Sequence, residues 1–181
     1  FVFDQQAAPG LAIVAVTLEL APDYHVYALT KAPGQQLDPT SLEVKQLVGL
    51  KPVSVGFEPT TAPELHEADV GTEVLQSLNH DGSVTWTRVY EVEAGASPGV
   101  EGSLRFQICK GEEFCLQPVT IPFSLGSLQD SADTQNATVI AGTLSSSVRQ
   151  TALAAAGHAL PEPNAASGPS TAAAPSALTA V

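Results

Sequence analysis

The strongest constraint on the fold lies in residues 104–123, where the two cysteines of the chain are flanked by alternating sequence. Apolar residues occupy every second position before Cys109 and again after Pro118. Alternation with a period of two on both sides of a short glycine-containing loop is typical of an antiparallel β-hairpin. Cys109 and Cys115 would then face each other near the tip of the hairpin, where the spacing of paired strands permits a disulfide.

The two arms of this hairpin do not match in register. Counted in twos along the arms, Cys109 falls on the solvent face and Cys115 falls on the core face. Cysteines that pair directly across two strands must point to the same face, so one extra residue has to be absorbed. Pro118 cannot donate a ladder hydrogen bond and marks the place. We therefore expect a bulge or break at Gln117 and Pro118 that directs both sulfurs outward.

The rest of the chain predicts further short strands and no convincing helix. Residues 1–10 are expected as a lead-in segment, and residues 58–72 as an irregular stretch too polar for a core strand. Short strands separated by regular turn signals predict an all-β protein, a β-sandwich. The expected strands are residues 11–20, 24–30, 42–48, 53–57, 73–79 and 84–94, together with the two arms of the hairpin.

The composition changes near residue 127. From residue 134 to the end of the sequence, Arg149 and Glu162 are the only charged residues, and residues 160–181 are rich in proline, alanine and serine. Such a composition is that of a linker that buries too little surface to fold. We predict a folded domain over residues 1–127 and a disordered low-complexity linker or tail over residues 128–181.

The net charge and the residue types limit which partners, metals and compartments fit this chain. The formal net charge of −12 argues against nucleic acid as a partner. The four histidines are scattered singly, and we expect them at the surface rather than in a zinc site. No cofactor is expected. Two cysteines at hairpin spacing indicate a pair that can oxidise, and hence an extracytoplasmic compartment.

The cysteine hairpin resembles a known family. A C-x5-C loop with Phe114 before the second cysteine and Pro118 shortly after it is similar to the amino-terminal domain of DsbD-type thiol:disulfide interchange proteins. Residues 23–27 resemble the early aromatic strand of that family, and residues 65–73 resemble the loop before its hairpin. The resemblance covers roughly residues 11–125, and the hairpin carries most of it.

The resemblance implies an immunoglobulin-like sandwich in the periplasm, with a linker to a membrane electron-transfer domain beyond residue 181 that would tether it to the inner membrane. It implies two catalytic cysteines: Cys115 would form mixed disulfides with thioredoxin-fold partner proteins or domains, and Cys109 would resolve them. Electrons would pass from a thioredoxin-like domain to oxidised periplasmic proteins, including those of cytochrome c maturation. The chain would then act as a protein-disulfide reductase domain.

One stretch departs from the family. Its best-known members shield the disulfide with a loop that carries an aromatic side chain, and residues 64–70 contain none. Shielding would then fall to Leu65 or Val70. Glu67 and Asp69 could tune the cysteines by their charge if this loop folds over them, and a solvated acidic loop is the simpler interpretation.

Two functions remain open from the sequence. In the first, Cys109 and Cys115 exchange electrons with partner proteins, and Tyr24 and Tyr27 could line the site, although aromatic residues of strands more often pack in the core. In the second, the chain is an extracytoplasmic binding module whose disulfide only clamps the hairpin. The reduction potential separates the two functions, because structural disulfides lie below about −300 mV.

Overall fold

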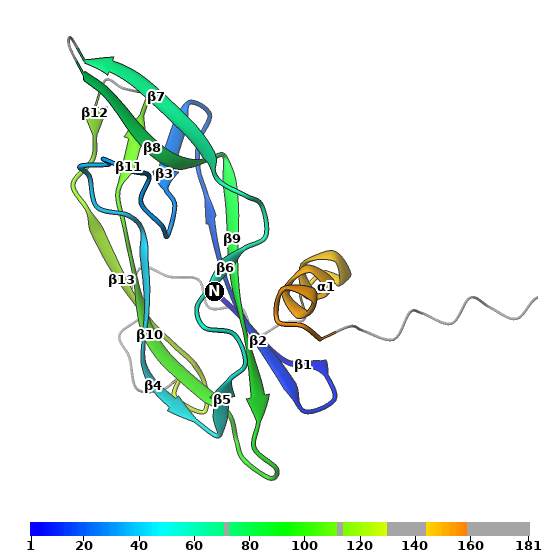
Figure 1. The fold of residues 1–181 in the computed structure, drawn as a ribbon. Coiled ribbons are helices and arrows are strands. Elements are labelled where there is room, and N and C mark those ends of the chain that lie inside the picture. The colour runs from blue at the N-terminus through cyan, green and yellow to red at the C-terminus, as the bar shows by residue number, and fades with distance from the viewer. Residues whose placement is uncertain (71–72, 112–113, 130–143, 159–181) are drawn as a thin grey trace, which may run out of the picture.

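The computed structural model describes residues 1–70, 73–111, 114–129 and 144–158 of the chain (Figure 1). Within these ranges the strands form three antiparallel sheets. The first sheet has the order β1 (Val2–Ala8), β2 (Leu11–Glu19), β9 (Ser83–Val92) and β5 (Leu50–Pro52), and β6 (Glu58–Pro59) also pairs with β9. The second sheet has the order β13 (Val119–Gly126), β10 (Gly99–Phe106) and β4 (Ser41–Val48).

The third sheet carries both cysteines. Its order is β12 (Phe114–Cys115), β11 (Ile108–Lys110), β3 (Tyr24–Tyr27), β8 (Glu73–Asp81) and β7 (Glu64–Val70). Figure 1 shows this sheet at one end of the molecule. β8 continues into β9 of the first sheet through Gly82, which adopts a positive φ of 70°. The third sheet is thereby attached to the sandwich formed by the other two.

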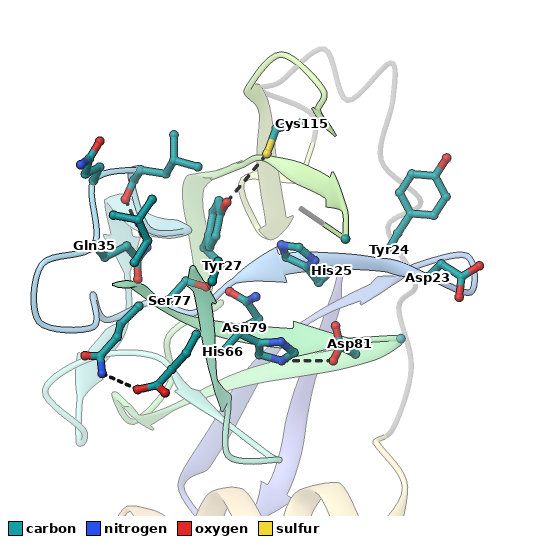
Figure 2. A pocket seen from close by; sticks show the side chains of 18 residues that line it. Asp23, Tyr24, His25, Tyr27, Gln35, His66, Ser77, Asn79, Asp81 and Cys115 are labelled. Atoms are coloured by element: carbon teal, nitrogen blue, oxygen red, sulfur yellow. Dashed lines mark hydrogen bonds and ion pairs between the residues drawn. The ribbon is translucent and has the colours of Figure 1, made fainter. Parts of the chain in front are cut away.

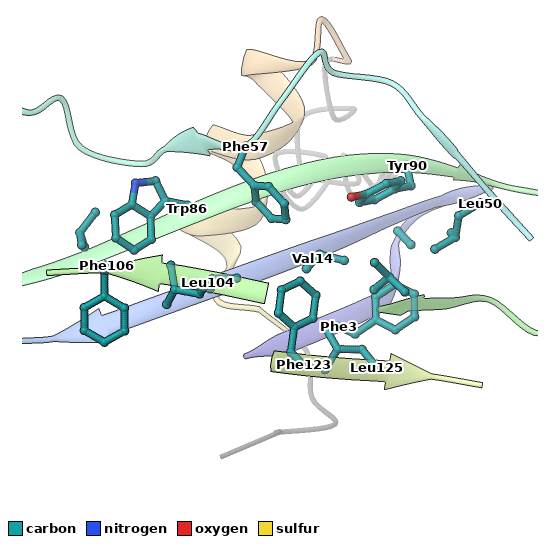
Figure 3. Packing of buried hydrophobic residues seen from close by; sticks show 14 of the residues in the cluster. Phe3, Val14, Leu50, Phe57, Trp86, Tyr90, Leu104, Phe106, Phe123 and Leu125 are labelled. Carbon is teal, nitrogen blue, oxygen red and sulfur yellow. The ribbon is translucent and has the colours of Figure 1, made fainter. Parts of the chain in front are cut away.

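The main hydrophobic core lies between the first and second sheets (Figure 3). Val14 and Trp86 contribute from the first sheet, and Leu104, Phe123 and Leu125 contribute from the second. Each is at most 2 % exposed, and full burial of one such apolar side chain contributes about 1.5–3 kcal/mol. The prediction of an all-β, immunoglobulin-like sandwich is confirmed.

Three segments of the first half differ from the prediction. Residues 1–10 form a strand, β1, because the turn before β2 is made by Gly10 at a φ of 71°. Residues 53–57 are not a strand, because the chain bends where the Ser54 hydroxyl donates to the Gly56 carbonyl. Residues 64–70 are not irregular but form β7, which stays polar because it lies at the edge of its sheet.

A helix, α1 (Ser146–Ala155), packs against the first sheet (Figure 1). Its Ala152 and Leu153 are buried in a second apolar cluster with Ile13 and Val89. The helix lies in the segment predicted as a linker, so residues 144–158 pack on the sandwich instead of leaving it. Residues 130–143 and 159–181 of the predicted tail lie outside the described residues. The division of the chain at residue 127 stays a prediction for limited proteolysis to test.

An ion pair fastens this helix to the start of the chain. The side chain of Asp4 is 2 % exposed, and its Oδ2 lies 2.8 Å from an Arg149 guanidinium nitrogen. The same carboxylate accepts a hydrogen bond from the Leu144 backbone N–H. No helix in the described ranges is long and apolar enough to cross a membrane.

Candidate functional site

Cys109 and Cys115 form a disulfide that joins β11 to β12. They are directly opposite each other in the register of the two strands, with their Cα atoms 4.0 Å apart. The sequence separation is six residues, so the bond closes the tip of the predicted hairpin.

The predicted break near Pro118 is confirmed. β10 and β13 pair Phe106 with Val119, whereas β11 and β12 pair Cys109 with Cys115. Between these two pairs lie residues 107 and 108 on the first arm and residues 116, 117 and 118 on the second, so the second arm holds one extra residue. At this break the chain passes from the second sheet to the third, where β11 pairs with β3.

The prediction that both sulfurs point outward is wrong for Cys109. Cys109 is 1 % exposed, whereas Cys115 is partly exposed. Because β11 changes sheet, the solvent face of β10 does not continue along it. Cys109 instead pairs with His25 of β3, and the Tyr27 side chain of the same strand reaches its Sγ. The two sulfurs of the bond therefore differ in their access to solvent.

A tyrosine hydroxyl touches both sulfurs. The Tyr27 hydroxyl lies 3.4 Å from the Cys109 Sγ and 3.8 Å from the Cys115 Sγ. Disulfide sulfurs carry no hydrogen, so the hydroxyl is the donor in both contacts. Burial raises the pKa of Tyr27 above its ordinary value of 10.0, which keeps the proton on the hydroxyl at neutral pH. Tyr27 is buried and also lines the site, so of the two alternatives for this residue core packing alone is not sufficient.

A cavity of about 840 Å³ opens beside Cys115 (Figure 2). Its wall is built from β3, β7 and β8 and from the segment around Gln35, and Cys115 borders it while Cys109 does not. A reactant that enters this cavity therefore meets the sulfur of Cys115 first.

The residues predicted to shield or tune the disulfide differ in their position relative to the cavity. Glu67 lines the cavity, and its carboxylate accepts a 2.7 Å hydrogen bond from the Gln76 side chain. Leu65 is 55 % exposed and does not line the cavity. The side chains of Asp69 and Val70 lie outside the described residues, although both residues pair with β8 through their backbone. Shielding and tuning by these side chains stay predictions.

The expectation that the histidines lie at the surface is wrong for His25 and His80. His25 is 9 % exposed and His80 is 5 % exposed, and burial lowers the pKa of each imidazole, with Asp81 acting in the opposite sense. His25 lies on the cavity wall with its ring 5.6 Å from that of Tyr27, centroid to centroid. The alternation of His25 with Tyr27 in one short strand was the available sign that both face the same side.

No family model matches the sequence, and no curated protein matches it. Among solved structures, the chain is similar to the "Crystal Structure of Neisseria meningitidis DsbD n-terminal domain in the reduced form". The identity is 14 %, the match covers 67 % of this chain and 80 % of that chain, and the TM-score is 0.39. The function proposed below therefore rests on the geometry of the site and on the resemblance seen in the sequence.

Proposed function

We propose that this chain is a thiol:disulfide exchange module in which Cys115 meets the partner and Cys109 resolves the mixed disulfide. The observation that carries the proposal is the unequal access to the two sulfurs: Cys109 is 1 % exposed, and Cys115 is partly exposed at the edge of a cavity. Exchange requires a thiolate to approach one sulfur directly. Unequal access assigns that approach to one cysteine and leaves the other for the internal step.

The proposed reaction moves two electrons from the reduced pair to a partner disulfide. The Cys115 thiolate attacks one partner sulfur, and the bond between the partner sulfurs breaks as the mixed disulfide forms. The Cys109 thiolate then attacks the Cys115 Sγ and displaces the partner as a thiolate, which takes up a proton. The products are the Cys109–Cys115 disulfide and a partner dithiol, and a thioredoxin-like donor would reverse these steps to reduce the pair again.

Tyr27 is suited to assist this reaction. Its hydroxyl lies within hydrogen-bond reach of both sulfurs, so it can donate to whichever sulfur carries the negative charge. A hydrogen bond to the thiolate favours the charged form and lowers the thiol pKa. A thiolate is both the attacking and the leaving group in each step, so this donor would serve both directions of exchange.

Apolar side chains beside Cys115 favour a protein partner. Phe114 is 46 % exposed and Leu116 is 48 % exposed, and they are the neighbours of Cys115 in the chain. Thioredoxin-fold partners, electron flow towards oxidised periplasmic proteins, a periplasmic location and a membrane tether beyond residue 181 are parts of this proposal that the sequence resemblance supports.

The competing function is a binding module with a structural disulfide. The burial of Cys109 and the short loop that the bond closes favour it. Trapping separates the two functions. The probe is a thioredoxin-fold protein whose single active-site cysteine is activated with thionitrobenzoate, so that release of the coloured thiol reports each mixed disulfide.

The variants Cys109→Ala and Cys115→Ala each leave one thiol. We expect Cys109→Ala to form the covalent complex at least about tenfold faster, because sulfur access limits exchange, and dithiothreitol should dissolve the complex. A faster reaction of Cys115→Ala would reverse the two roles. If neither variant forms a complex, the exchange function is refuted and the disulfide is a structural clamp.

A further inference from the structure

Three side chains near the outer end of the cavity form a cluster that the exchange reaction does not use. Glu64 and His66 come from β7 and Asp81 comes from β8, and one ligand atom of each lies within 4.8 Å of the others. The His66 Nε2 lies 3.5 Å from the Asp81 Oδ2. All three side chains are exposed, so an ion from solution can reach them.

The spacing of these atoms suits a metal ion. A tetrahedral zinc ion binds nitrogen and oxygen at about 2.0–2.2 Å, which places the ligand atoms about 3.4 Å from one another. The separation of His66 and Asp81 already has this value, at 3.5 Å. The Glu64 carboxylate oxygen lies within 4.8 Å of the other two ligand atoms, so it has to approach by at most about 1.4 Å, which rotation of an exposed side chain provides.

A buried residue on the cavity wall adds an independent observation. Asn79 is 3 % exposed and lines the cavity, and its Oδ1 has no hydrogen-bond partner among the described residues. A buried polar atom without a partner in the protein is one that a water or a ligand can satisfy. Figure 2 shows the Asn79 amide gathered with the side chains of His25, His66 and Asp81.

His25 lies next to the cluster on the cavity wall. It is paired directly with Asp81 in the register of β3 and β8, and side chains at such positions lie within contact distance. Its ring stacks on that of His66, with the centroids 6.3 Å apart and the planes 19° from parallel. His25 therefore lies beside the cluster, and its stacked ring helps to hold the imidazole of His66 in place.

We propose that Glu64, His66 and Asp81 bind a divalent transition cation, with water completing its coordination and the Asn79 carbonyl available as a hydrogen-bond acceptor beside the cluster. Imidazole and carboxylate ligands together suit Zn²⁺, whereas Ca²⁺ and Mg²⁺ prefer oxygen ligands alone. Metal-bound histidines usually donate their second N–H to a carbonyl or carboxylate, and Asn79 supplies such an acceptor. The net charge of −12 also attracts cations.

Titration calorimetry with zinc chloride tests this site. The full chain is used without a polyhistidine tag and with its disulfide intact, because oxidised cysteines offer no thiolate to zinc. We expect one zinc ion per chain. His66→Ala should weaken binding at least about tenfold, since it removes a ligand. Calcium chloride should bind at least about tenfold more weakly than zinc chloride.

His158→Ala is the matched control, because His158 follows α1 and lies away from the cavity. This variant should bind zinc as the unchanged chain does. Cobalt in place of zinc gives a second readout on the unmodified chain, a d–d absorption band of four-coordinate intensity. The proposal is overturned if zinc does not bind, if His66→Ala binds it unchanged, or if calcium binds equally well. These outcomes are independent of the exchange function, because no cysteine takes part.

Discussion

Replacing Tyr27 with phenylalanine removes the hydroxyl that touches both sulfurs and keeps the ring that fills the space. The hydroxyl lies 3.4 Å from the Cys109 Sγ and 3.8 Å from the Cys115 Sγ. In the reduced protein this hydroxyl can donate a hydrogen bond to a thiolate, and that bond is stronger than one to a neutral thiol. Its loss should therefore raise the thiol pKa and leave the fold intact.

The size of the effect follows from the strength of such a bond. A hydrogen bond to a charged group contributes about 1.5–3 kcal/mol, and one pKa unit corresponds to about 1.4 kcal/mol. Sulfur is a weak acceptor, so the lower end applies and the pKa should rise by about one unit. The shift should be larger for Cys109 than for Cys115, because the hydroxyl is closer to Cys109.

The assay follows the ultraviolet absorbance of the thiolate across pH. Each thiol is measured alone, Cys109 in the Cys115→Ala variant and Cys115 in the Cys109→Ala variant, with and without Tyr27→Phe. Tyr24→Phe is the control, because Tyr24 lines the same cavity but its hydroxyl has no hydrogen bond within the described part of the chain. An unchanged or lowered pKa in Tyr27→Phe would refute the assigned role of the hydroxyl.

Three further predictions concern stability and docking. Arg149→Ala leaves the Asp4 carboxylate buried without its ion partner, which should destabilise the fold by about 3–5 kcal/mol. An unchanged melting temperature would contradict the docked helix. Gly102→Ala places a Cβ against the Glu43 carbonyl oxygen and should destabilise the sandwich by about 3 kcal/mol in a urea titration; an unchanged midpoint would contradict this close packing. Phe114→Ser should change stability by less than about 0.5 kcal/mol but slow exchange with a protein disulfide more than with a small one; equal slowing of both would argue against docking through Phe114.

The hairpin was predictable because its signals are local. Alternation on both arms fixed the strands, and the conflict in parity beside Pro118 located the break. The burial of Cys109 was not predictable in this way, because it follows from the passage of β11 into another sheet and from its pairing with β3. That pairing joins segments more than eighty residues apart.

The helix was missed for a related reason. Its docking depends on Asp4 and Arg149, which are distant in sequence and adjacent only in the fold. One sign was present: residues 11–16 are apolar at every position, which is typical of a strand buried on both faces. The second sheet covers Val14 and α1 covers Ile13. The continuous apolar run was therefore an indirect sign that a further element packs on this sheet.

The cavity wall was the least predictable part of the site. His25, His66 and Asp81 are isolated in the sequence, and only the order β3, β8, β7 brings them together. β7 itself is polar on both sides, because it is an edge strand, so it lacks the alternation that marks a half-buried strand. Register and strand order, which the pattern of a single strand does not contain, create this group of side chains.

The reduction potential of the Cys109–Cys115 pair tests the central claim most directly. The chain is equilibrated with thiol–disulfide buffers, the fraction of oxidised pair is measured by thiol alkylation, and circular dichroism monitors the fold of the reduced form. The exchange function predicts a potential between about −270 and −120 mV, the range of exchange proteins, with the sandwich retained after reduction. A potential below about −300 mV, or unfolding on reduction, would contradict the exchange function and make the disulfide a structural clamp.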